Sequence, residues 1–101
     1  MDINKLMKQA QDMQRQLEDA NKQITAMEFE GNASNGLAKV KVNGDHKILK
    51  VEIQKEIISP DDKEMIEDLI MIATNEAITK ADEAKKKKFG SMANSIGLPK
   101  I

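Results

Sequence analysis

The 101-residue chain has no cysteine, tryptophan or tyrosine, and its only aromatic residues are Phe29 and Phe89. The lack of cysteine excludes a disulfide framework, a thiolate metal site and a thiol nucleophile, and it fits a reducing compartment. Few aromatic side chains and a mean hydropathy of -0.55 predict a thin core unless a partner contributes surface.

Long apolar segments are also missing from the sequence. The N-terminus lacks the apolar stretch of a secretion signal, and no run approaches the roughly 20 apolar residues of a membrane-spanning helix. We therefore predict a soluble protein of the cytoplasm with no membrane partner. The length predicts one domain, residues 1–101.

The net charge of -1 hides a segregation of charge along the chain. Residues 57–79 carry six acidic side chains and one lysine, whereas residues 80–101 carry six lysines and two acidic side chains. A pI near 5.8 argues against a histone-like polycation, but the basic end can still contact a polyanion.

The first 27 residues carry an unbroken heptad pattern. It predicts a helix over about 2–27 with one narrow apolar stripe, roughly 40 Å long. A chain of this size cannot enclose such a rod, so the stripe needs a second long helix, a second copy of the chain, or both. This indicates a binding or architectural protein. The stripe consists of Ile3, Leu6, Ala10, Met13, Leu17, Ala20, Ile24 and Met27.

Three short strands are predicted next, around Phe29 and over residues 37–42 and 47–53, because apolar and charged residues alternate there. We place Gly44 and Asp45 at the centre of a type II′ turn, which puts Val40 opposite Leu49 and gathers the apolar residues on one face. Centring the turn one residue earlier would divide the apolar residues between both faces.

A second helix is predicted to begin at Ser59 and Pro60, with Ser59 as the N-cap and acidic residues near the positive end of the helix dipole. Gly90 is expected to end it, and residues 90–101 are expected to be loosely ordered. The fold class is therefore α+β, in the order α-β-β-β-α, with a three-stranded antiparallel sheet between long N-terminal and C-terminal helices.

Catalytic and metal sites find little support in the sequence. His46, the only histidine, falls at the predicted turn and is interpreted as a solvated turn residue. The acidic residues of 61–68 do not have the spacing of a calcium-binding loop, and the loop between Gly31 and Gly36 lacks a phosphate-binding pattern. We predict no enzyme activity, catalytic residue, metal, cofactor or small-molecule substrate.

Basic residues are the strongest candidates for a binding site. Lys8, Arg15 and Lys22 share the outward face of the first helix, either as a polyanion surface or as a solvated salt-bridge ladder with Asp12 and Asp19. The run 85–88 suits the negative end of the second helix dipole, but clustered lysines also bind duplex phosphates. Stacking aromatics are scarce, which favours duplex over single-stranded nucleic acid.

Several segments together resemble the YbaB/EbfC family of bacterial nucleoid-associated proteins, and the resemblance covers nearly the whole chain. The first is Leu6-Met7-Lys8-Gln9-Ala10-Gln11, which continues to Met13-Gln14, and the hairpin Gly36–Gly44 follows it. The segment Asp61–Ile70, followed by Ala73–Ala77, resembles the family's most recognisable stretch, and Gly97-Leu98-Pro99 resembles the family's ending.

The resemblance implies a tweezer-like homodimer that binds DNA in the nucleoid and compacts or reshapes the chromosome, with little sequence preference. It also implies basic residues near the projecting helix ends as the binding site. With the outward face of the first helix, the candidate DNA-binding residues are Lys5, Lys8, Arg15, Lys85, Lys86, Lys87 and Lys88. The alternative function is a dimeric adaptor or chaperone-like clamp that grips polypeptide with its long helices.

Overall fold

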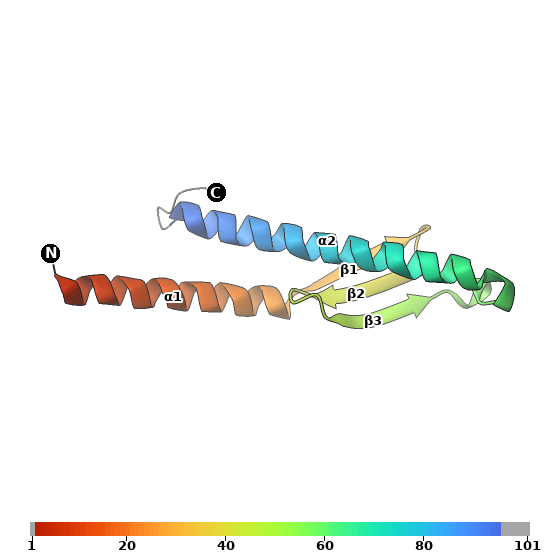
Figure 1. Ribbon diagram of the computed structural model, residues 1–101, viewed down its shortest axis with the longest axis horizontal. Coiled ribbons are helices and arrows are strands. Elements are labelled where there is room, and N and C mark those ends of the chain that lie inside the picture. The colour runs from red at the N-terminus through yellow and green to blue at the C-terminus, as the bar shows by residue number, and fades with distance from the viewer. Residues whose placement is uncertain (1, 96–101) are drawn as a thin grey trace.

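Two long helices and a three-stranded sheet form an elongated molecule of 71 × 22 × 16 Å (Figure 1). The computed structural model describes residues 2–95. The order α-β-β-β-α confirms the predicted fold class. The elements are α1 (Ile3–Ala26), β1 (Glu28–Ala33), β2 (Ala38–Asn43), β3 (Ile48–Ile53), two 3-10 helices (Lys55–Ile57 and Pro60–Asp62) and α2 (Lys63–Ser95).

Helix α1 begins and ends within one residue of the predicted bounds. The side chain of Asp2 caps it by accepting a hydrogen bond of 3.1 Å from the backbone N–H of Asn4. At the other end, Met27 has extended backbone angles and leads directly into β1. The helix therefore joins the sheet without a flexible linker.

The core lies between α2 and one face of the sheet. The strands are antiparallel in the order β1-β2-β3, and α2 packs on β1 and β2 while leaving most of β3 uncovered. A row of small residues on α2 allows close approach, since a Cβ on Gly31 would lie 1.9 Å from the carbonyl oxygen of Ala73. The buried apolar residues of this core are Ala33, Ala38, Val40, Val42, Leu69, Ala73, Ala77 and Ala81.

The hairpin between β2 and β3 differs from the prediction. Val40 lies opposite Val51, not Leu49, and an irregularity after Lys41 brings Val42 opposite Ile48. The shift of two residues at Val40 keeps Val51 on the predicted apolar face, since side chains alternate with a period of two.

The turn itself explains the wrong register. The backbone N–H of His46 donates to the carbonyl of Asn43 at 3.0 Å, and His46 has a φ of 66°. The connection is thus a three-residue loop with its last residue in the left-handed region, instead of a type II′ turn. The side chain of Asn43 stabilises it by accepting hydrogen bonds from the N–H groups of Asp45 and Lys47, at 2.9 and 3.0 Å.

Helix α2 departs from the prediction at both ends. Ser59 acts as a cap, accepting a hydrogen bond of 3.3 Å from the N–H of Asp61, but residues 60–62 form a 3-10 helix and the α-helix begins at Lys63. Gly90 does not end the helix, which continues to Ser95. The part of the predicted loose tail at 90–95 is therefore helical, and residues 96–101 lie outside the described residues.

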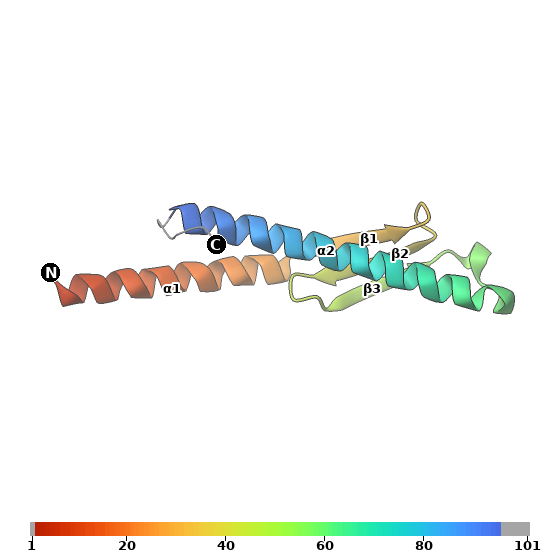
Figure 2. The same cartoon turned by 45° about the horizontal axis from the view of Figure 1, so that its top comes forward.

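Helix α1 and the C-terminal part of α2 project from the sheet in the same direction and lie side by side in Figures 1 and 2. We call residues 3–26 and 84–95 together the arm. The heptad stripe is buried only where α1 meets the sheet, at Ala20 and Ile24, whereas Ile3 and Leu6 remain 71% and 44% exposed. One copy of the chain therefore leaves most of the stripe uncovered.

Candidate nucleic-acid interface

The fold places all seven candidate DNA-binding residues on the arm (Figure 1). The candidates at 85–88 belong to α2, and the others project from α1. An α-helix has about 3.6 residues per turn, so four consecutive residues are distributed around the helix. Residues 85–88 therefore point in different directions. The arm therefore carries positive charge on more than one side.

Within the run at 85–88, Lys88 has a structural contact with α1. The ammonium group of Lys88 donates a short hydrogen bond to the side-chain oxygen of Gln23 and so joins the two helices of the arm. Lys87 and Lys88 also border a cleft of about 530 Å³ between the helices, together with Ile24, Met27 and Ala84. Sequence reasoning missed this cleft, although Ile24 and Met27 at the end of the heptad pattern could have indicated it.

The remaining lysines of the run are more available. Within residues 2–95, the ion pairs of the structure include none with Lys85, Lys86 or Lys87. Lys86 and Lys87 are exposed and Lys85 is half-buried. Their charges are consequently not neutralised by a neighbouring carboxylate.

The candidates on α1 form a separate group. Lys5, Lys8 and Arg15 are exposed, and the salt-bridge ladder considered for this face is not formed in the described chain, where neither Lys8 nor Arg15 has an ion pair. At about 1.5 Å per residue, Lys5 lies roughly 27 Å along α1 from Gln23, which contacts Lys88. The structure thus brings the two groups onto one arm but not into one cluster.

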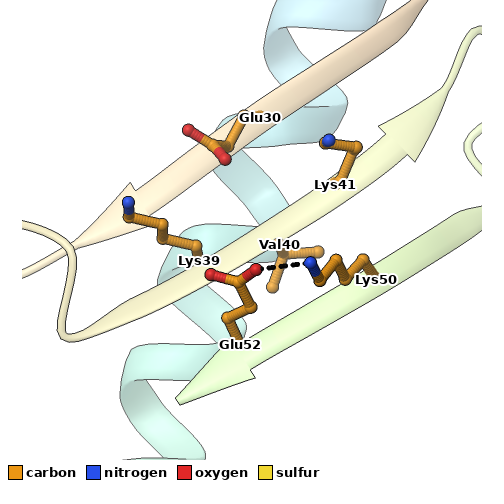
Figure 3. Close-up of a pocket in the computed structure, with 6 residues that line it drawn as sticks. All are labelled: Glu30, Lys39, Val40, Lys41, Lys50 and Glu52. Atoms are coloured by element: carbon orange, nitrogen blue, oxygen red, sulfur yellow. Dashed lines mark ion pairs between the residues drawn. The ribbon is translucent and has the colours of Figure 1, made fainter. Parts of the chain in front are cut away.

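The outer face of the sheet also carries lysines, but here carboxylates lie on the same face (Figure 3). Lys50 forms an ion pair of 2.7 Å with Glu52, and Lys41 forms one of 3.3 Å with Glu28. The hydrogen bond and charge of Lys50 lower the pKa of Glu52, while Glu52 raises the pKa of Lys50. This mixed-charge face is less suited to a polyanion than the arm.

His46 has a partner that sequence reasoning did not anticipate. Its Nε2 atom lies 2.6 Å from Oδ1 of Asp82 on α2, while its exposed position in the turn agrees with the prediction. Among the described residues, no group of three or more histidine, aspartate or glutamate side chains could hold a metal ion. No helix within residues 2–95 has the length and apolar character needed to cross a bilayer.

Long helices that project from a small sheet and carry lysines without carboxylate partners are suited to contact an extended polyanion. A family comparison agrees: residues 1–96 match the model of the YbaB/EbfC DNA-binding family. The chain belongs to this family, which confirms the resemblance seen in the sequence.

Individual relatives support the assignment. A nucleoid-associated protein of Clostridium novyi (strain NT) is 38% identical over 99 residues, covering 98% of this chain and 87% of the relative. A nucleoid-associated protein of Clostridium perfringens (strain SM101) is 41% identical over 97 residues, covering 96% and 87%. The fold is similar to the crystal structure of an uncharacterized Helicobacter pylori protein, with a TM-score of 0.77 at 20% identity, covering 91% of this chain and 97% of that one.

Proposed function

We propose that this protein binds duplex DNA in the bacterial nucleoid, mainly through the phosphate backbone, and thereby compacts or reshapes it. The observation that carries the proposal is the uncompensated lysine run at 85–88 on the arm of a member of a DNA-binding family. Lysines that neutralise phosphates release condensed counterions, which drives binding and makes it sensitive to salt. Phosphate contacts carry no direct sequence information, so little base preference is expected.

The distance between the two basic groups supports a contact along the DNA axis. The roughly 27 Å from Lys5 to the Lys88 contact corresponds to about eight base-pair steps of 3.4 Å. One arm could then touch phosphates at two places along a duplex. The proposed DNA-binding residues are Lys5, Lys8, Arg15, Lys85, Lys86, Lys87 and Lys88.

We also propose that the protein acts as a homodimer, with β3 in the interface. Strand β3 is an edge strand, and its apolar residues Ile48, Leu49 and Val51 are 50%, 46% and 45% exposed because α2 does not extend over them. An exposed apolar edge strand favours association with another chain. A twofold axis beside β3 would give the DNA two arms, which doubles the number of phosphate contacts.

Replacement of the lysine run tests the DNA proposal. We expect a variant with glutamine at all four positions 85–88 to bind a duplex more weakly and with a shallower salt dependence, by about 0.9 slope units per lost phosphate contact. The matched control replaces Lys39, Lys41 and Lys50 on the sheet face by glutamine, and this variant should bind as the parent does. Unchanged affinity in the 85–88 variant would remove these lysines from the interface.

A peptide-binding adaptor or clamp is the second candidate, favoured by the exposed stripe of α1. Ile3, Leu6 and Leu17 are 71%, 44% and 40% exposed, which gives the arm an apolar surface that DNA phosphates would not use. Competition separates the two functions. If the arm is a clamp, it should keep a bound polypeptide when excess duplex is added. If the arm binds DNA, the duplex should displace the polypeptide.

A further inference from the structure

Two surfaces of the molecule, one at the base of the arm and one at the end of the molecule far from the arm, carry opposite charges (Figure 1). One is the cleft in the arm, which we call the arm cleft. The other, which we call the acidic end, is the connection from β3 into the start of α2 at residues 55–68. It contains six acidic residues and two lysines.

The arm cleft has an apolar floor and a basic border. Met27 and Ala84 supply the apolar surface above the buried Ile24, and Lys87 and Lys88 stand beside it, around a volume of about 530 Å³. Met27 is 46% exposed, so the apolar surface is open to solvent. A ligand with an apolar group flanked by negative charge would satisfy both parts of the cleft.

The acidic end presents that combination. Ile58 is 62% exposed on the segment between the two 3-10 helices. Glu56 and Asp61, both exposed, lie two residues before it and three residues after it. Of the two lysines nearby, Lys63 is engaged by Glu67 at 3.4 Å. The acidic end therefore offers an exposed apolar side chain within a negatively charged surface.

We propose that the acidic end of one molecule docks into the arm cleft of a second copy. Ile58 would contact the apolar floor, and the neighbouring carboxylates would lie beside Lys87 and Lys88. Because the two surfaces are different and lie at a distance from each other, the contact is heterologous, and each molecule can bind a further copy at either surface, which builds chains or rings. Because the contact pairs exposed charges, salt weakens it.

This self-association uses two of the lysines proposed for DNA binding but does not depend on DNA. A carboxylate surface and a phosphate backbone would compete for the same ammonium groups. The protein free of DNA would then form chains that a duplex dissociates. The inference can fail while the DNA proposal stands, since the two are measured separately.

Sedimentation velocity of the purified protein tests the contact without DNA. At about 50 mM salt we expect the weight-average mass to rise with protein concentration above that of the smallest species, and at about 500 mM salt to return to it. The Ile58→Ser variant should lose the rise, whereas the control Ile3→Ser, at another exposed isoleucine, should keep it. A parent mass that is independent of concentration at low salt would overturn the proposal.

A mixing experiment tests the pairing of charges directly. A Glu56→Lys, Asp61→Lys variant and a Lys87→Glu, Lys88→Glu variant should each fail to self-associate, because each brings like charges together. An equimolar mixture should associate again, since the charge-reversed positions 56 and 61 of the first variant meet the charge-reversed cleft of the second. If circular dichroism shows both variants folded and the mixture still does not associate, the proposed docking is wrong.

Discussion

Nε2 of His46 lies 2.6 Å from Oδ1 of Asp82 and ties the β2–β3 turn to the middle of α2. The same turn contacts α1, since the hydroxyl of Thr25 donates to the carboxylate of Asp45 at 3.3 Å. A Cβ on Gly44 would lie 2.1 Å from the carbonyl oxygen of Ile24, so the turn also packs closely on α1. This turn therefore sits where both helices of the arm leave the sheet.

We expect Asp82→Asn to lower the free energy of unfolding by about 0.2–1 kcal/mol, because the side chains of the pair are 39% and 57% exposed and solvent weakens their attraction. Urea unfolding measures the change. Glu83→Gln is the matched control, because this neighbouring acid has no ion pair among the described residues. An equal effect of both substitutions would show that general charge, not the contact to His46, is responsible.

Glycine substitutions distinguish close packing from helix propensity. Gly31→Ala should destabilise the fold by about 1–3 kcal/mol or more, because its Cβ would lie 1.9 Å from the carbonyl oxygen of Ala73 and push α2 off the sheet. Gly90→Ala should stabilise by about 0.5–1 kcal/mol, since a Cβ there meets nothing within 4 Å and α2 is helical at this position. Denaturant midpoints of both variants check this, and a stable Gly31→Ala protein would contradict the described packing.

The ion pair on the sheet face should be visible in a pH titration. Lys50 lowers the pKa of Glu52 below its ordinary value of 4.5, so the carboxylate stays charged to lower pH in the folded state. The contribution of this carboxylate to stability is therefore present above about pH 4.5 and is lost as the pH falls through the lowered pKa. NMR should find the midpoint of Glu52 below 4.5, and Lys50→Met should move it upward.

A charge on the uncovered strand should prevent dimer formation. Val51 is 45% exposed on β3, on the face that α2 leaves open. In the proposed dimer a lysine there would be buried without a partner, so we expect Val51→Lys to be monomeric by light scattering. Glu52→Gln, on the opposite face of the same strand, should remain dimeric. A dimeric Val51→Lys protein would place the interface elsewhere.

Sequence patterns predict the helices and strands of this fold better than the turns and helix ends that connect them. Apolar periodicity located both helices and all three strands, because amphipathic elements must bury one side. The predicted hairpin register is wrong because the prediction places the positive φ of the turn at Gly44, whereas in the structure His46 has the positive φ. The turn is therefore longer, and hydrogen bonds to the side chain of Asn43 stabilise it. Such local hydrogen bonds are not visible in an alternation of apolar residues.

The prediction that Gly90 ends the second helix is wrong because it overestimates the effect of one glycine. A glycine inside a helix costs only about 1 kcal/mol relative to alanine, and α2 is long enough to tolerate it. In the candidate interface, charge patterning found the basic residues, but it could not show that Lys88 contacts Gln23 or that Asp82 contacts His46. Both contacts join residues far apart in the chain, and only the packing of α1 and the hairpin on α2 brings them together.

The central claim is that the arm binds duplex DNA through phosphates, and a salt series tests it most directly. Fluorescence anisotropy of a labelled duplex of about 30 base pairs should give a linear fall of log affinity with log salt. Four or more phosphate contacts predict a slope of about -3.6 or steeper. A slope near zero, or no binding at about 50 mM salt, would contradict the account.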